Sequence, residues 1–275
     1  MKNIVQRNNV RISGNGDQYM IFANGFGCDQ NVWRHVIPAF RENYKVVLFD
    51  YVGTGQSDLS AYDSTRYENL DGYALDILEI CEELLIKDAI LVGHSVSCMI
   101  GVKAALLKPD LFSQLIFVAP SPSYTNDGDY TGGFEKEELL GLFEVMDNNY
   151  LGWSSMVAPL IMGNKNAHEL SDELNNNFCA NDPNIAAEFG RVTFFSDSRV
   201  DLPKLTIPSL TLQCLEDMLA PLAVGEYIHR VTPFNTLRVL KATGHCPHMS
   251  APQETIDVIS SYLMQSNHAN GSARI

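Results

Sequence analysis

The feature that most constrains this chain is a short apolar run that ends in a tight turn built from small residues. Residues 89–92 read Ala-Ile-Leu-Val, which predicts a short buried strand. The pentapeptide Gly-His-Ser-Val-Ser follows at residues 93–97, and apolar residues then continue at helical spacing. A strand that turns this sharply into a helix needs small residues two before and two after the tip, and Gly93 and Ser97 meet that need. We therefore expect Ser95 to project its hydroxyl above the end of a sheet, at the mouth of a pocket.

The pentapeptide departs from the commoner G-x-S-x-G form, because a serine stands where a second glycine is usual. The turn would place the Val96 N–H at the amino end of a helix, where it can meet an oxyanion. Taken alone, the motif also fits a tight turn with a solvent-facing serine. Ser97 would lie inside the helix, so it is not a credible second nucleophile.

The size and charge of the chain narrow the classes of protein it can belong to. Its 275 residues suit one large domain, or one domain with an insertion, and 45% hydrophobic residues suffice for a full core. The 19 basic and 33 acidic residues give a net charge of −14 without any basic block, which argues against nucleic acid or an anionic membrane as partner. Residues 1–17 lack a signal-peptide stretch, and no apolar run approaches a membrane span. The six cysteines form no C-x-x-C pair, so we expect reduced thiols and a cytoplasmic setting.

Strand and helix patterns alternate along the first part of the chain and again near its end. This rhythm predicts an α/β fold with a mostly parallel central sheet and helices on both faces. The expected strands cover residues 9–13, 19–23, 45–49, 89–92, 114–119, 209–214 and 236–240. The expected helices of this part cover residues 31–40, 70–86, 223–231 and 252–264, together with the one that follows the turn at Ser95 and runs to about residue 107.

The rhythm breaks over about 80 residues in the middle of the chain, where only helical patterns occur. They cover residues 135–146, 150–162, 167–178 and 183–193. We read this stretch as a helical lid inserted between two strands of the sheet. The expected organisation is a core of residues 1–120 and 200–264, a lid of residues 121–199 and a frayed polar tail of residues 265–275. Aromatic residues in the lid either line a pocket or hold its helices together, and the sequence leaves both open.

A glycine-bracketed loop follows the strand at residues 19–23. Gly25 and Gly27 flank Phe26 and let the backbone approach a ligand closely. In a hydrolase of this class the loop supplies a second oxyanion donor, which here would be the Phe26 N–H. A plain strand-to-helix turn is the alternative.

A histidine and an acid follow the last two strands, in the chain order Ser, acid, His that this architecture requires. A serine alkoxide is inaccessible at neutral pH, so a histidine must take its proton and a carboxylate must hold the imidazole. His245 is best placed, with His248 as its rival. Asp217 is preferred to Glu216 because a shorter side chain suits a rigid loop, although chemistry alone leaves both open.

We expect no metal and no cofactor. The sequence has no H-x-x-x-H motif and no paired cysteines, and His245 and His248 lack a nearby third ligand. The glycine-rich turn at residues 50–58 lacks the lysine of a phosphate-binding loop. Asp50 precedes the serine, which is the wrong order for the acid of this architecture.

These residues resemble the RsbQ group of α/β-hydrolases, which also includes the plant karrikin and strigolactone receptors. The similarity spans the chain to about Met264. The segments that carry it are Asn24–Gln30, Leu48–Gly53, Gly93–Ser97, Asn126–Glu135, Phe195–Arg199 and Gly244–Ser250.

The resemblance implies an α/β-hydrolase fold with a four-helix lid, a Ser95, Asp217 and His245 triad, and oxyanion donors at Phe26 and Val96. The pocket residues expected on this basis are Tyr124, Phe134, Leu142, Trp153, Val157, Phe194 and Met218. The bacterial member of the group acts with a PAS-domain phosphatase in the sigma-B stress pathway, so a similar partner is implied here.

Two functions follow as hypotheses. The first is a carboxylesterase-like serine hydrolase that cleaves a small hydrophobic ester or lactone and is tied to stress signalling. The second is a signalling receptor that binds a hydrophobic ligand and regulates a partner phosphatase with little or slow turnover. An aromatic lid fits both.

Overall fold

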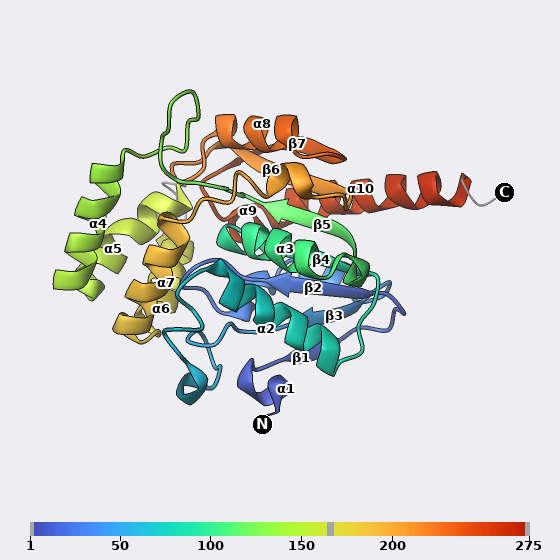
Figure 1. The fold of residues 1–275 in the computed structure, drawn as a ribbon, viewed down its shortest axis with the longest axis horizontal. Helices are drawn as coiled ribbons and strands as arrows, with labels where there is room; N and C mark the ends of the chain where they lie inside the picture. The colour runs from blue at the N-terminus through green and yellow to red at the C-terminus, as the bar shows by residue number, and fades with distance from the viewer. Residues whose placement is uncertain (1–2, 164–167, 273–275) are drawn as a thin grey trace.

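A seven-stranded sheet forms the centre of the molecule in the computed structural model, which describes residues 3–163 and 168–272 (Figure 1). The strand order is β1-β3-β2-β4-β5-β6-β7, and only β1 runs antiparallel to its neighbour. The strands are β1 (Arg11–Ser13), β2 (Tyr19–Ala23), β3 (Lys45–Leu48), β4 (Ala89–His94), β5 (Phe112–Val118), β6 (Ser209–Glu216) and β7 (Asn235–Thr243). The predicted mostly parallel α/β architecture is confirmed.

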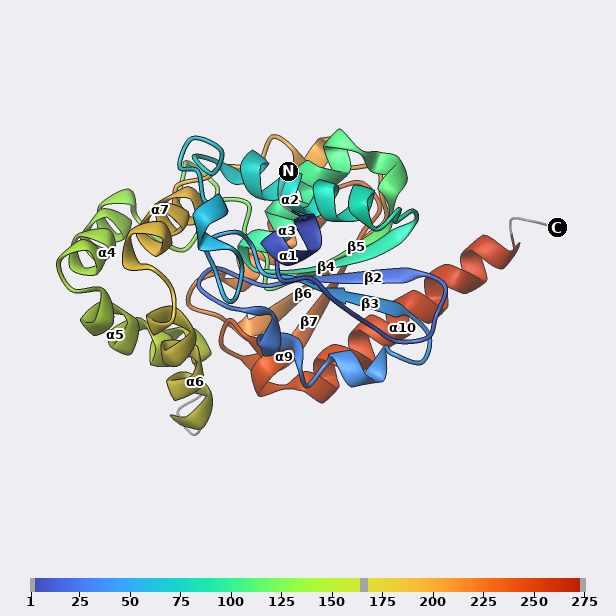
Figure 2. The ribbon, with the colours of Figure 1, turned by 90° about the horizontal axis from the view of Figure 1, so that it is seen from below.

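Helices cover both faces of the sheet, as a parallel sheet requires because its strands are buried on both sides (Figure 2). Helices α2 (Leu70–Glu83) and α3 (Val96–Leu107) lie on one face, and α10 (Pro252–Ser272) lies on the other. The remaining elements around the sheet are α1 (Ile4–Arg7), α8 (Leu222–Val231), α9 (Pro247–Ser250) and the 3₁₀ turns η1 (Gln30–Trp33), η2 (Ile37–Ala39), η3 (Leu59–Ala61), η4 (Pro109–Leu111) and η5 (Leu202–Lys204). None of the described helices is both long and apolar enough to cross a membrane.

Four helices inserted between β5 and β6 form the predicted lid, which sits at one end of the sheet (Figures 1 and 2). They are α4 (Lys136–Asn148), α5 (Tyr150–Met162), α6 (His168–Cys179) and α7 (Pro183–Phe194). Local signals set several of their ends. Asp182 caps α7 by accepting from two backbone N–H groups, with Pro183 in the first turn. Helix α5 ends where Gly163 adopts a left-handed φ of 62°.

Two expectations about the elements are wrong. Residues 31–40 do not form one amphipathic helix, because Pro38 cannot donate to a helical ladder, and the segment splits into η1 and η2. Trp33 and Val36 in this segment are nevertheless fully buried. The tail after residue 264 is not frayed at its start, since α10 continues to Ser272 and carries the chain away from the body (Figure 1). Residues 273–275 lie outside the described part of the chain.

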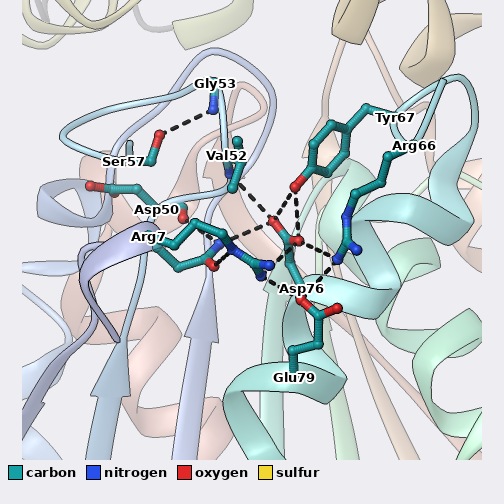
Figure 3. Close-up of polar contacts among 10 residues, drawn as sticks. Arg7, Asp50, Val52, Gly53, Ser57, Arg66, Tyr67, Asp76 and Glu79 are labelled. Carbon is teal, nitrogen blue, oxygen red and sulfur yellow. Dashed lines mark hydrogen bonds and ion pairs between the residues drawn. The ribbon is translucent and has the colours of Figure 1, made fainter. Parts of the chain in front are cut away.

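A buried carboxylate on α2 ties three distant segments to the side of the core (Figure 3). Asp76 is fully buried and accepts from the guanidinium groups of Arg7 and Arg66, 3.1 and 2.9 Å away. The Tyr67 hydroxyl donates to the same carboxylate at 2.9 Å, and the Val52 N–H does so at 3.4 Å. The N-terminal segment and the turn after β3 are therefore held against α2.

Candidate functional site

The predicted serine, acid and histidine all lie at the carboxyl end of the parallel strands. Ser95 follows β4, Asp217 follows β6 and His245 lies just beyond β7. Because β4, β5, β6 and β7 are successive neighbours in the sheet, these strand ends meet at one edge, the usual place for a ligand site in such sheets.

The turn at Ser95 has the strained geometry that the sequence predicts. Ser95 adopts φ 56° and ψ −124°, a conformation that non-glycine residues rarely occupy. A Cβ at Gly93 would lie 2.7 Å from the backbone carbonyl of Ser97, so the position before the turn must be glycine. The strain is compatible with a folded state because β4 and α3 hold the residue from both sides.

Hydrogen bonds join the three side chains in a row. The Ser95 hydroxyl oxygen lies 2.8 Å from His245 Nε2, and His245 Nδ1 lies 2.7 Å from Asp217 Oδ2. The second oxygen of Asp217 accepts from the backbone N–H groups of Leu219 and Ala220, at 2.9 and 3.2 Å. With Nδ1–H donating to the carboxylate, the Nε2 lone pair faces the serine hydroxyl. The row can therefore move the serine proton onto the imidazole.

Glu216 and His248, the alternatives to Asp217 and His245, lie elsewhere. Glu216 points its side chain to solvent, and only its backbone carbonyl contacts the site, by accepting from the Gly244 N–H at 2.7 Å. His248 stacks on Trp33, with ring centroids 4.5 Å apart, and neither of its nitrogens has a partner in the described part of the chain. Burial and the neighbouring His245 lower the pKa of His248 to about 3, so it stays neutral.

The His94 side chain contacts the loop that carries His245. Its Nε2 lies 2.9 Å from the backbone carbonyl of His245. Burial, together with the nearby His248 and His245, holds the pKa of His94 well below its usual value. A neutral His94 thus supports the backbone that carries the His245 ring.

The lid contacts the same histidine loop through its backbone. The His245 N–H donates to the carbonyl of Ile161, near the end of α5, at 2.8 Å. A Cβ at Gly244 would lie 1.9 Å from the Met162 carbonyl oxygen, and Gly244 has a φ of 85°. Both the close approach and the left-handed backbone therefore require glycine before His245.

The loop after β2 forms a tight turn around Phe26. The Cys28 N–H donates to the Gly25 carbonyl at 3.2 Å, and Gly27 has a φ of 71°. This turn hydrogen bond does not use the Phe26 N–H. Val96 is the first residue of α3, so its N–H has no partner within the helix. Both predicted oxyanion donors are therefore free of the local backbone ladder.

A cavity of about 20 Å³ lies directly over Ser95 and His245. Apolar side chains from the lid and from the loop after β2 make half of its wall. Besides Ser95 and His245, the wall residues are Phe26, Cys28, His94, Ile161, Leu174, Phe178, Thr193, Phe194, Leu219 and Cys246. The Thr193 hydroxyl is buried and has no hydrogen-bond partner among the described residues.

The expected pocket residues only partly match this wall. Phe194 borders the cavity, and the Tyr124 hydroxyl lies 3.2 Å from the Ser95 hydroxyl oxygen. Trp153 stands behind the wall, with its ring 6.3 Å from that of Phe26. Met218 is 45% exposed, and the next residue, Leu219, borders the cavity in its place. Phe134, Leu142 and Val157 also lie outside the cavity wall.

Most of the wall residues are not among those expected from the sequence. Phe26 is expected to contribute its N–H, yet its ring also lies at the centre of the aromatic residues of the lid. Its centroid is 5.9 Å from Phe178, 5.6 Å from Phe189 and 6.1 Å from Phe194. The signal in the sequence is an aromatic residue between two glycines directly after an expected strand.

Within residues 3–163 and 168–272, no three His, Cys, Asp or Glu side chains gather as ligands.

Comparison with known proteins identifies the family. The chain belongs to the α/β-hydrolase family, whose model matches residues 20–258. A karrikin insensitive 2 receptor of Petunia hybrida is 40% identical over 94% of this chain and 97% of its own length. Strigolactone esterase D14 of Arabidopsis thaliana is 38% identical over 92% of this chain and 94% of its own length. A solved hydrolase of Oleispira antarctica has a TM-score of 0.93 at 40% identity, covering 96% of this chain and 97% of that one. The resemblance to the group that includes these plant receptors is confirmed.

Proposed function

We propose that the protein is a carboxylesterase-like serine hydrolase that cleaves a small hydrophobic ester or lactone. The observation that carries this proposal is the row of hydrogen bonds from Ser95 through His245 to buried Asp217, next to an apolar cavity.

In this mechanism the Ser95 hydroxyl attacks the substrate carbonyl while His245 Nε2 takes its proton. Asp217 holds the imidazole in the productive tautomer and stabilises its cation. The Phe26 and Val96 N–H groups stabilise the oxyanion of the tetrahedral intermediate. His245 then donates its proton to the leaving oxygen, and water, activated by the same histidine, hydrolyses the acyl-enzyme.

The test of the nucleophile is Ser95→Ala. With p-nitrophenyl acetate as substrate, we expect kcat/KM to fall by about 10⁴-fold or more, because removal of a triad member leaves only binding and the oxyanion site. The proposal fails if the variant keeps the activity of the unaltered protein. Labelling by a fluorophosphonate probe, present in the unaltered protein and lost in the variant, identifies the same serine independently of turnover.

The small cavity supports a preference for short acyl groups. One water molecule needs a cavity of roughly 10–15 Å³. The cavity of about 20 Å³ therefore leaves little room over Ser95. We expect kcat/KM to fall along the series p-nitrophenyl acetate, butyrate and octanoate, since longer chains must displace the aromatic wall. A rise along the series would contradict a short acyl site.

A receptor role is the second candidate, favoured by relatives of about 40% identity whose names are those of karrikin receptors. In that case the same residues capture or slowly turn over a hydrophobic ligand, and the lid contacts a partner such as a PAS-domain phosphatase of a stress pathway. Kinetics separate the two. Steady multiple turnover favours the enzyme, whereas a single burst followed by near silence favours the receptor. A cytoplasmic setting remains part of this proposal, to be tested by cell fractionation.

A further inference from the structure

The serine that replaces the usual second glycine of the turn has a partner on each side. Ser97 is fully buried in the first turn of α3. Its hydroxyl donates to the backbone carbonyl of Asn24 at 2.5 Å, and the Tyr51 hydroxyl lies 2.9 Å from the same oxygen. Since Ser97 uses its proton toward Asn24, Tyr51 is the donor of the second bond. The structure thus gives Ser97 a task that glycine cannot perform.

The Asn24 carbonyl lies at the start of the turn that carries Phe26. The Asn24 side-chain amide reaches across this turn and donates to the Cys28 carbonyl at 2.5 Å. On the lid side, the Asn181 amide donates to the Gly27 carbonyl at 2.9 Å. The turn is therefore held at both ends and from the lid side. Among the hydrogen bonds of the described residues, the one from Ser97 joins it to α3, the helix that begins with Val96. A glycine at position 97 would leave the Asn24 carbonyl and the Tyr51 hydroxyl without these buried partners.

Tyr51 is itself firmly held. It is fully buried, and its ring lies 5.0 Å from that of Phe49 and 5.6 Å from that of Tyr73. The next residue, Val52, donates its N–H to the buried carboxylate of Asp76 (Figure 3). The Tyr51 hydroxyl can therefore act as a fixed donor to Ser97.

We propose that Ser97, supported by Tyr51, is a positioning residue that sets the distance between the two oxyanion donors, Phe26 N–H and Val96 N–H. Both donors are anchored to the same hydroxyl, one through the Asn24 carbonyl and the other through the first turn of α3. The inference rests on the proposed serine-hydrolase function. Oxyanion stabilisation depends on donors held about 2.7–3.1 Å from the developing charge, so a small displacement of the Phe26 turn lowers the rate of acylation.

The experiment compares Ser97→Ala and Tyr51→Phe with the unaltered full chain and with Ser95→Ala. The acylation rate constant is the rate of the p-nitrophenol burst from p-nitrophenyl acetate. The affinity for a trifluoromethyl ketone, which forms a tetrahedral oxyanion on Ser95, reports transition-state binding. A matched control is Ser209→Ala, which removes another fully buried hydroxyl. This hydroxyl accepts from the Asn235 side chain at 2.9 Å. Ser209 lies at the amino end of β6, whereas the site lies at the carboxyl ends of the strands.

For Ser97→Ala we expect a fall of about 10-fold or more in the acylation rate constant and an equal loss of ketone affinity, with the dissociation constant Ks of the ester, taken from the concentration dependence of the burst rate, changed less than about 2-fold. That is less than the ~10²–10³-fold effect of deleting an oxyanion donor, because the donor is displaced and not removed. Tyr51→Phe should lower both quantities by about 3-fold, and the double variant should be no worse than Ser97→Ala, because both act through one hydroxyl. Ser209→Ala should leave both unchanged.

Unchanged acylation and ketone affinity in Ser97→Ala, with Ser95→Ala inactive, would overturn this role alone. Equal losses in Ser209→Ala would also overturn it, since general loosening would then explain the effect. Should Ser97→Ala not fold, Tyr51→Phe decides the question by the same two measurements. Full activity in Ser95→Ala would overturn the proposed function, and this role with it.

Discussion

Two buried carboxylates with opposite surroundings organise this molecule. Asp76, on α2, accepts hydrogen bonds from two arginines, a tyrosine, an asparagine and a backbone N–H. The arginines are permanently charged, and the other donors are neutral groups that stay protonated. Asp217, after β6, accepts from two backbone N–H groups and from one imidazole. Both carboxylates are buried, so burial alone does not distinguish them.

The difference lies in what the partner can do with a proton. An arginine stays protonated at any physiological pH, so the Asp76 cluster can hold segments together but cannot transfer a proton. An imidazole gains and loses a proton near neutral pH, and its second nitrogen here faces a serine at the wall of a cavity. A buried acid is therefore a candidate for catalysis when its partner can gain and lose a proton and when that partner borders a cavity.

The largest effect that tests this contrast is expected for Asp217→Asn. The amide no longer favours the required imidazole tautomer, so we expect kcat/KM for p-nitrophenyl acetate to fall by about 10⁴-fold. The matched control is Glu216→Gln, the neighbouring exposed acid, which should stay within about 2-fold of the unaltered protein. A larger loss in the control than in Asp217→Asn would reverse our choice of the acid.

Asp76→Asn should act on stability instead. Removal of one partner leaves the Arg7 and Arg66 guanidinium groups facing a neutral side chain, and breaking a buried ion pair typically costs about 3–5 kcal/mol in the free energy of unfolding. Urea unfolding measures this, and the acylation rate should fall far less than in Asp217→Asn. Glu79→Gln serves as control, because it bonds the same arginines from a partly exposed position and should cost about 1 kcal/mol or less. Equal costs in the two variants would remove the distinction we draw for Asp76.

The smallest expected effect is on the pH dependence of stability, and it concerns His248, whose imidazole is not part of the site. The pKa of His248 is about 3 in the folded protein against 6.5 for an ordinary histidine, so above pH 6.5 it is neutral in both states. Between pH 6.5 and 3 the unfolded chain binds a proton that the folded protein refuses, and stability falls with acid by up to about 1.4 kcal/mol per pH unit.

His248→Phe removes this acid-dependent loss of stability and breaks no hydrogen bond among the described residues. Chemical unfolding at pH 7 and pH 5 should therefore show a shallower loss of stability in the variant, with little difference at pH 7. His229→Gln, at an exposed position of α8, is the control. The same slope in His248→Phe and in the unaltered protein would show that His248 takes up protons before unfolding.

How far the sequence predicts each region depends on how local its signals are. Apolar runs predict the buried strands, and β2 has the bounds expected from its run. Helix α5 likewise has the bounds expected from its helical pattern. Pro38 marks where the expected helix over residues 31–40 fails, because one residue without an N–H outweighs an amphipathic pattern. The tail beyond residue 264 has no apolar periodicity, yet its helix continues from the packed part of α10.

The sequence by itself indicated that Ser95, an acid at position 216 or 217 and a histidine at position 245 or 248 share one edge of a sheet. It could do so because each residue follows a strand, and parallel strands place their carboxyl ends together. Only the tertiary structure shows that Asp217, and not Glu216, contacts His245. It also places His248 against Trp33, outside the site. Most of the cavity wall comes from Phe26, Phe178 and their neighbours in place of the expected pocket residues. The same holds for Ser97, whose partners lie 46 and 73 residues away. The physical reason is that side-chain direction on a lid helix or a loop is set by packing between distant segments, which leaves no periodic trace in the chain.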